Sequence, residues 1–118
     1  MEWEVEFTDE FFRWRDALSE AVQVSVTGKV ILLQKIGPRL SRPHADGVRF
    51  SRHPSMKELR VQHSGRPYRV LFAFDPRRCA ILLLGGDKTG KNRWYQDFVP
   101  KADVLYDQHL SSLRKEDK

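Results

Sequence analysis

The chain has 118 residues and a mass of 13.9 kDa, of which 40% are apolar, so it supplies one hydrophobic core and we expect a single domain over residues 1–118. A mean hydropathy of −0.59, apolar runs of strand length and an acidic N-terminal start argue against a membrane span or a secretory signal, and we expect a cytoplasmic protein. The net charge of +5 is unevenly distributed, with −5 over residues 1–20 and +10 over residues 35–93. That concentration predicts a polyanionic partner, most often nucleic acid.

The first 37 residues predict a strand followed by two helices. Apolar residues alternate with glutamates from Glu2 to Phe7, which is the period of a half-buried strand. Thr8 and the two acids that follow it are typical of a helix start. A second helix is expected from about Glu20 to Ile36, ending at a Gly-Pro pair, although the alternation from Val22 to Val26 also fits a strand.

The middle of the chain predicts a long loop and then an antiparallel meander. Residues 37–55 contain three prolines and no clear period, and a loop of that length is usually functional or partly disordered. Three strands are expected over residues 58–62, 68–74 and 79–85, the last buried on both faces. A helical turn through Trp94 and Tyr95 then leads to a final helix that begins at Pro100.

The first hairpin of the meander has a register that the sequence specifies. If Ser64 and Gly65 form a two-residue loop, Leu59 faces Val70 and Arg60 faces Arg69. Like charges opposite each other destabilise a sheet by roughly 0.2 to 1 kcal/mol. A phosphate bound between the two arginines would offset that repulsion, and the alternative is two arginines turned into water.

Neither a nucleotide-binding loop nor a metal site is predicted from the remaining motifs. Gly85 to Asn92 nearly matches a phosphate-binding P-loop, but asparagine replaces the hydroxyl residue that holds magnesium, and only helix follows. These glycines are instead expected to turn the chain sharply and bring Lys88 and Lys91 beside the sheet. The four histidines and the only cysteine show no metal-ligand spacing, so neither a metal site nor a cofactor is predicted. The single cysteine and the tryptophans are expected in the core, namely Cys79, Trp3, Trp14 and Trp94.

Four segments resemble HigB-like toxins of the RelE/ParE superfamily, and they are Lys57–Arg60, Arg66–Phe72, Asp75–Arg78 and Ile81–Gly90. The expected α+β order is similar to the RelE-like fold: an N-terminal strand, two helices, an antiparallel meander sheet and a C-terminal helix. The resemblance implies a toxin of a type II toxin-antitoxin system that enters the ribosomal A site and cuts mRNA. It also implies a helix-turn-helix antitoxin that joins the toxin in a hetero-oligomer.

The same resemblance implies a metal-independent endoribonuclease in which the ribose 2′-OH attacks the adjacent phosphate. Such chemistry requires a base, cations for the growing charge and an acid for the departing 5′-oxygen. Matching positions assign the catalytic roles to Arg60, Arg69, Lys88 and Tyr95, with Arg69 on the phosphate in the transition state. We expect the other basic residues of these segments and of the following loop to contact RNA or the ribosome, namely Lys57, Arg66, Arg77, Arg78, Lys91 and Arg93.

Two sets of alternatives remain open. Some family members rely on histidine, so His53 or His63 stands as an alternative to Tyr95, and a lysine base would need a lowered pKa. Among functions, the alternatives are a ParE-like inhibitor that binds DNA gyrase and a non-catalytic nucleic-acid-binding module. Clustered basic residues on one sheet face favour the nuclease.

Overall fold

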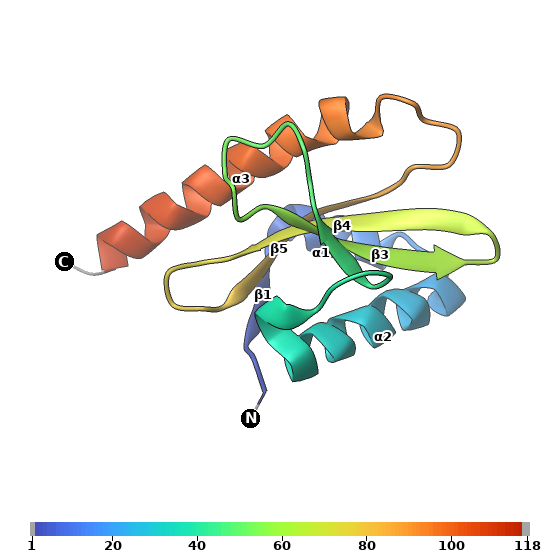
Figure 1. Cartoon of the computed structure of the whole chain (residues 1–118), viewed down its shortest axis with the longest axis horizontal. Coiled ribbons are helices and arrows are strands. Elements are labelled where there is room, and N and C mark those ends of the chain that lie inside the picture. Colours follow the sequence, from blue (N-terminus) through green and yellow to red (C-terminus); the bar gives the residue numbers. More distant parts are fainter. Residues whose placement is uncertain (1, 117–118) are drawn as a thin grey trace.

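The computed structural model describes residues 2–116 and shows one sheet with helices on both of its faces (Figure 1). The elements in chain order are β1 (Val5–Phe7), α1 (Asp9–Asp16), α2 (Glu20–Ile36), a 3₁₀ turn η1 (Gly37–Arg39), β2 (Ala45–Gly47), β3 (Lys57–His63), β4 (Arg66–Phe74), β5 (Ala80–Asp87) and α3 (Trp94–Glu116). The strand order is β1-β5-β4-β3-β2, with β1 parallel to β5 and the other neighbours antiparallel. The predicted α+β class and order of elements are confirmed.

α1 begins after the predicted cap at Thr8, and α2 begins and ends where the sequence predicts. The Thr8 hydroxyl accepts a hydrogen bond from the Phe11 amide at 3.0 Å, and Ser19 caps α2 in the same way. α2 ends at Gly37, whose φ of 71° is a conformation that favours glycine. Val22 and Val26 are buried one helical turn apart, so the alternative of a strand in this segment is wrong.

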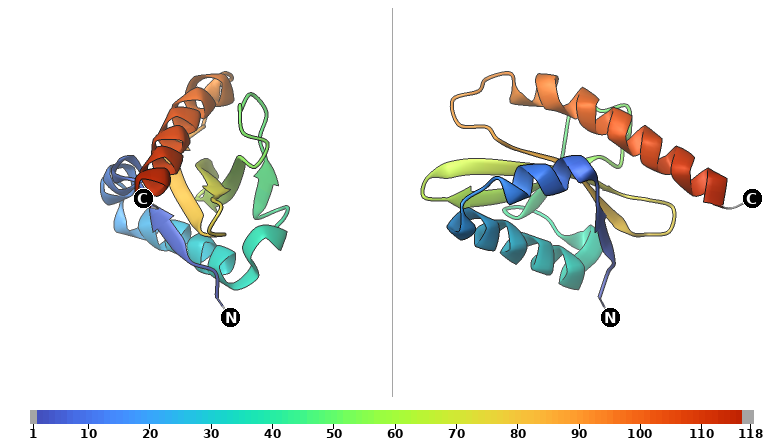
Figure 2. Two further views of the ribbon diagram at one scale, coloured as in Figure 1. Left: turned by 90° about the vertical axis from the view of Figure 1, so that its left-hand side faces the viewer. Right: turned by 180° about the vertical axis from the view of Figure 1, so that it is seen from behind.

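The sheet separates two apolar cores. α1 and α2 cover one face, where Leu59, Val70 and Phe72 are buried, and α3 covers the other, where Leu71 and Leu83 are buried (Figure 2). β5 lies between β1 and β4 and is buried on both faces, as its continuous apolar run predicts.

The glycine pair at the end of β5 has a different role from the one predicted. Gly85 and Gly86 do not form a sharp turn; they lie inside β5. A Cβ atom would lie 2.2 Å from the Trp14 ring at Gly85 and 2.8 Å from the Trp94 ring at Gly86. Both tryptophans therefore pack directly on backbone, one on each face, and the turn comes later at Gly90, where φ is 67°.

Residues 37–55 are more ordered than a plain loop. They contain η1 and the edge strand β2, which pairs with β3 so that Ala45 faces Leu59. A three-residue strand has too few side chains to show a period, and backbone pairing with β3 supplies its order. The prediction of a long loop is therefore wrong for the residues of η1 and β2.

The C-terminal helix begins six residues earlier than predicted. α3 runs without interruption from Trp94 to Glu116, with Pro100 inside it. A proline in a helix interior removes one backbone hydrogen bond, which costs about 3 kcal/mol. Trp94 and Val99 before the proline and Ala102 after it are buried in one cluster, so packing keeps both parts on the same helix. None of the helices in residues 2–116 is both long and apolar enough to cross a membrane.

Candidate active site

The predicted register of the β3–β4 hairpin is confirmed. Leu59 faces Val70, and Arg60 faces Arg69 across the ladder. Side chains alternate between faces along a strand, and Glu58 faces Leu71, which belongs to the core under α3. Glu58 and both arginines therefore project from the α3 face of the sheet.

Glu58 compensates the charge of Arg69. Arg69 Nε lies 3.3 Å from Glu58 Oε1, and both side chains are only 6% exposed. The Arg69 guanidinium also donates from Nη1 to the Tyr68 carbonyl at 3.0 Å. The alternative in which both arginines turn into water is therefore wrong for Arg69, whose partner is a carboxylate of this chain. Sequence reasoning missed Glu58, although it lies two residues before Arg60 on the same face.

Tyr95 joins this pair from the first turn of α3. Its hydroxyl donates a hydrogen bond to Glu58 Oε1 at 2.6 Å. Burial, and after it the hydrogen bond to Glu58, raises the pKa of Tyr95 above its usual value. The phenol therefore keeps its proton at neutral pH and is able to donate it. The other carboxylate oxygen, Glu58 Oε2, has no hydrogen-bond partner in residues 2–116 and is not among the fully buried polar atoms.

Lys88 lies beside the Tyr95 ring, directly after β5. Its ammonium is 5.1 Å from the ring centroid, and its backbone N–H donates to the Pro67 carbonyl at 3.0 Å. Burial, and then the positive charge of Arg69, lowers the pKa of Lys88, which is the direction that a lysine base requires. Within the described residues, the side chains of Lys88 and Arg60 make no hydrogen bond or ion pair, so these two half-buried cations are available to an anion.

Several predicted RNA contacts lie elsewhere. Lys57 is on the α2 face, where its ammonium donates to the Pro38 carbonyl at 3.1 Å. Lys57 and Arg60 are three positions apart along β3, so their side chains project from opposite faces of the sheet. Arg66 pairs with Asp87 at 3.0 Å at the hairpin end.

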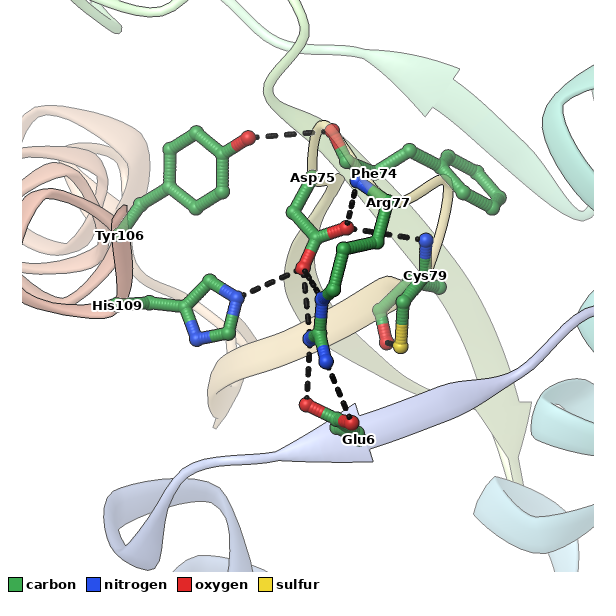
Figure 3. A network of polar contacts seen from close by, with 8 residues as sticks. Glu6, Phe74, Asp75, Arg77, Cys79, Tyr106 and His109 are labelled. Carbon is green, nitrogen blue, oxygen red and sulfur yellow. Dashed lines mark hydrogen bonds and ion pairs between the residues drawn. The ribbon is translucent and has the colours of Figure 1, made fainter. Parts of the chain in front are cut away.

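Arg77 and Arg78 lie in the β4–β5 turn, at the opposite end of β4 from Arg69, and are not part of the site. The Arg77 guanidinium lies 2.8 Å from both Glu6 Oε1 and Asp75 Oδ2, in the network of Figure 3. The Arg78 guanidinium lies 5.2 Å from the centre of the Trp3 ring. Both arginines hold the turn against β1 and its flank, which the local sequence could not indicate because Glu6 and Trp3 are distant from them in the chain.

The remaining candidates divide between the border of the site and other surfaces. Lys91 and Arg93 are exposed on the loop between Lys88 and α3, and so border the site. His53 Nε2 lies 2.7 Å from Asp107, while His63 Nδ1 lies 2.8 Å from the Ser25 hydroxyl on the α2 face. Neither histidine makes a hydrogen bond or ion pair with Glu58, Arg69 or Tyr95 in residues 2–116.

One group of three potential metal ligands occurs in the described residues, at Glu4, Glu6 and Cys79, with ligand atoms within 4.8 Å of one another. Glu6 is already paired with Arg77. Burial raises the pKa of the Cys79 thiol to about 11, which disfavours the thiolate that a metal requires. This group lies beside β1 and has no connection with the candidate active site.

Solved structures define the fold. The structure is similar to the isolated Escherichia coli RelE toxin, with a TM-score of 0.59 and 12% identity, covering 80% of this chain and 93% of that one. It is also similar to toxin-antitoxin complexes, RelBE from E. coli (TM-score 0.56, 13% identity, 71% and 94% covered) and RelBE2 from Mycobacterium tuberculosis (TM-score 0.55, 16% identity, 74% and 99% covered). The chain therefore has the RelE fold.

Sequence relatives define the family more narrowly. The family described as Phage derived protein Gp49-like matches residues 13–107. Two relatives come from M. tuberculosis: Putative toxin HigB3 is 50% identical over 101 residues, covering 85% of this chain and 87% of the relative, and Putative toxin HigB2 is 41% identical over 102 residues. This chain spans about half the length of HigB2, since the match covers 51% of that relative. The protein belongs to the Gp49-like family of HigB-like toxins, as the resemblance predicts.

Proposed function

We propose that this toxin is a ribosome-dependent endoribonuclease that cuts mRNA. The observation that carries the proposal is the convergence of four predicted residues with Glu58 at one end of the sheet. Arg60 and Lys88 supply unpaired positive charge there, and the Tyr95–Glu58 pair supplies groups able to exchange a proton. An inhibitor that only binds its target needs no such pairing of phenol, carboxylate and free cations.

The proposed chemistry assigns one role to each group. Glu58 accepts the proton of the ribose 2′-OH through Oε2 as the oxygen attacks phosphorus. Arg60 and Lys88 stabilise the charge that develops on the phosphate oxygens, so the mechanism requires no metal ion. Tyr95 donates its proton to the departing 5′-oxygen, which leaves a 2′,3′-cyclic phosphate and a free 5′-hydroxyl.

The free enzyme also contains a route for resetting these groups. After cleavage, Glu58 carries the proton taken from the 2′-OH and Tyr95 is a phenolate. Rotation of the protonated carboxyl group carries that proton from the Oε2 position to the side that faces Tyr95, where the carboxyl and phenol oxygens lie 2.6 Å apart, and the proton then passes to the phenolate. Arg69, buried against Glu58, holds the carboxylate in place and acts as a positioning residue.

The partners follow from the same proposal. The substrate is mRNA in the ribosome, and the antitoxin is a helix-turn-helix protein that forms a hetero-oligomer with this chain. Two similar solved structures are toxin-antitoxin complexes, which supports a protein antitoxin. A tagged toxin expressed from its native locus should co-purify with the product of a small adjacent reading frame.

The decisive experiment maps mRNA 5′ ends after brief expression of the protein. We expect new ends inside translated reading frames, their loss in Arg60→Ala, and their retention in Arg78→Ala, whose arginine lies at the other end of β4. Arg69→Ala is a poor probe because it leaves the buried Glu58 carboxylate unpaired. Gyrase-dependent DNA breaks without new mRNA ends would replace the nuclease with a gyrase inhibitor, and intact RNA and DNA would indicate a binding module.

A further inference from the structure

We propose that Phe50 and Arg49, in the loop between β2 and β3, form a second RNA-contact site that stacks an unpaired base next to the cleaved nucleotides. The inference rests on the proposed nuclease function and adds to it a place for the neighbouring part of the RNA strand. It starts from an exposed aromatic ring in an unusual backbone conformation.

Phe50 combines exposure with backbone strain. Its side chain is 57% exposed, and its φ of 73° lies in the left-handed region, which residues with a Cβ rarely adopt. Phe50 belongs to neither of the two apolar cores, so burial of its ring in a core does not compensate for this conformation. Residues held in such conformations by their surroundings occur preferentially at functional sites.

The surroundings that hold Phe50 come from α3. Asp103, which is 1% exposed, accepts hydrogen bonds from the Ser51 hydroxyl at 2.6 Å and from the Arg52 backbone N–H at 2.9 Å. The Arg52 guanidinium pairs with Asp107, which also contacts His53. The buried Asp103 carboxylate on α3 thus fixes a short loop whose central side chain, that of Phe50, is more than half exposed to solvent.

The loop lies on the same side of the sheet as the candidate active site. It rises beside α3, as both views in Figure 2 show, and leads through buried Met56 into β3, which carries Glu58. Asp103, which anchors the loop, and Tyr95, which belongs to the site, are eight residues apart on α3. At 1.5 Å per residue that separation is about 12 Å along the helix, within reach of a few nucleotides of one strand.

The chemistry of the pair suits single-stranded RNA. An exposed aromatic face stacks on any base, and a neighbouring arginine binds the phosphate or adds a cation–π contact. Arg49 is exposed and pairs with no side chain in residues 2–116. Phe7 and Phe12 are exposed too, but they stack on each other, with ring centres 6.1 Å apart, in the acidic N-terminal segment, where phosphate is repelled.

The test measures binding of the purified protein to a fluorescent single-stranded RNA oligonucleotide. Phe50→Ala should weaken binding roughly 5- to 150-fold, the range for losing one stacked base, and Phe50→Trp should restore it. Phe50→Gly should weaken binding while the Tm stays equal or rises, because glycine adopts this φ without strain. Phe12→Ala, which removes a ring that is 49% exposed from the acidic segment, is the matched control and should leave RNA affinity unchanged.

Unchanged RNA affinity in Phe50→Ala overturns the inference, and so does a Tm that falls in Phe50→Gly together with the affinity, because that would make Phe50 a structural residue. Mapping of mRNA 5′ ends tests the nuclease separately: new ends in cells combined with unchanged affinity of Phe50→Ala would reject this second site alone. Absence of mRNA cleavage together with a stacking-dependent affinity would reject the nuclease and retain the RNA contact.

Discussion

Single residues of the site differ chiefly in whether their charge is already neutralised. Arg69 is buried against Glu58, whereas Arg60 and Lys88 are half-buried and pair with no side chain in residues 2–116. In the proposed mechanism, the two arginines that the register places opposite each other have different roles: Arg69 orients the Glu58 carboxylate, and Arg60 is free to bind phosphate. Substitutions at these positions should separate the two functions.

Tyr95→Phe removes the proposed acid and keeps the ring. We expect cleavage to fall by about 10²- to 10⁴-fold, the usual contribution of a general acid, and the free energy of unfolding to fall by about 1 to 3 kcal/mol for the lost bond to Glu58. Tyr106→Phe is the control, since its hydroxyl donates to the Phe74 carbonyl outside the site. Equal cleavage rates for the two variants would remove Tyr95 from the chemistry.

Glu58→Gln should destabilise the protein, because it leaves the Arg69 guanidinium buried without a counter-charge. Loss of one partner of a buried ion pair typically lowers the free energy of unfolding by about 3 to 5 kcal/mol. The double variant Glu58→Gln/Arg69→Met should recover much of that loss and remain inactive. Denaturant unfolding measures the stabilities, and strictly additive effects of the two substitutions would contradict the pairing.

Lys88→Arg distinguishes a phosphate contact from a base. The guanidinium keeps the positive charge but cannot give up its proton at neutral pH. With Glu58 as the base, we expect the variant to retain cleavage within about tenfold, while Lys88→Ala loses considerably more. If Lys88→Arg is as inactive as Lys88→Ala, the lowered pKa of Lys88 points to the lysine as the base.

At the scale of elements, the β4–β5 turn is the point where β1, the meander and α3 are joined. Buried Asp75 accepts hydrogen bonds from the backbone N–H groups of Arg77 and Cys79, and its Oδ2 lies 2.9 Å from His109 Nε2 on α3 (Figure 3). The Tyr106 hydroxyl bonds the Phe74 carbonyl beside it. These contacts hold the C-terminal half of α3 against the β4–β5 turn.

Asp75→Asn should show how much this junction depends on charge. Burial raises the pKa of Asp75, but hydrogen bonds from His109 and Arg77 lower it, and their combined effect outweighs that of burial. The pKa of the native carboxyl is therefore below that in the unfolded chain. Its stabilising effect is therefore complete above about pH 4 and is lost as the pH falls through the lowered native pKa. Denaturant unfolding at several pH values should show that the free energy of unfolding of the variant is about 1 to 3 kcal/mol lower than that of the wild type at pH 7. This difference should become smaller below pH 4.

The control for this element is Asp107→Asn, which changes an exposed carboxylate of the same helix and should alter stability much less. If Asp75→Asn lowered the free energy of unfolding by the same amount at pH 3 and at pH 7, the carboxylate charge would make no contribution to stability.

At the scale of the whole molecule, the basic residues that the sequence predicts for RNA binding lie at two ends of the sheet and do not form one surface. Arg60, Arg69 and Lys88 lie toward the β3–β4 hairpin, whereas Arg77 and Arg78 lie in the turn at the other end of β4. Acidic residues of the N-terminal segment neutralise part of the second group, as the pair of Arg77 and Glu6 shows. RNA should therefore bind at one end only.

The salt dependence of RNA affinity tests whether RNA binds at one end of the sheet. Each phosphate contact contributes about one unit to the slope of log affinity against log salt concentration. Arg60→Ala should reduce the slope by about one, and Arg78→Ala should leave it unchanged because its guanidinium packs over the Trp3 ring. Equal reductions in both variants would show that RNA covers both ends of the sheet.

The sequence by itself determined most of the local elements, though not β2 or the start of α3, together with the hairpin register and the family resemblance. Periods of two and 3.6 residues, the capping side chains Thr8 and Ser19, and a two-residue turn are local features, and each acts through neighbours along the chain. The register in turn placed Arg60 opposite Arg69 before any tertiary contact was known. Even the face of Lys57 was implied by the alternation along β3.

Only the tertiary structure decided which charges are free. The pairing of Glu58 with Arg69 and Tyr95, the retention of Arg77 and Arg78 at the far turn, and the anchoring of the Phe50 loop by Asp103 all join residues that are distant in sequence. Such contacts depend on how α3 and β1 lie against the sheet, and burial then determines whether a charge is compensated inside the protein or left for a ligand.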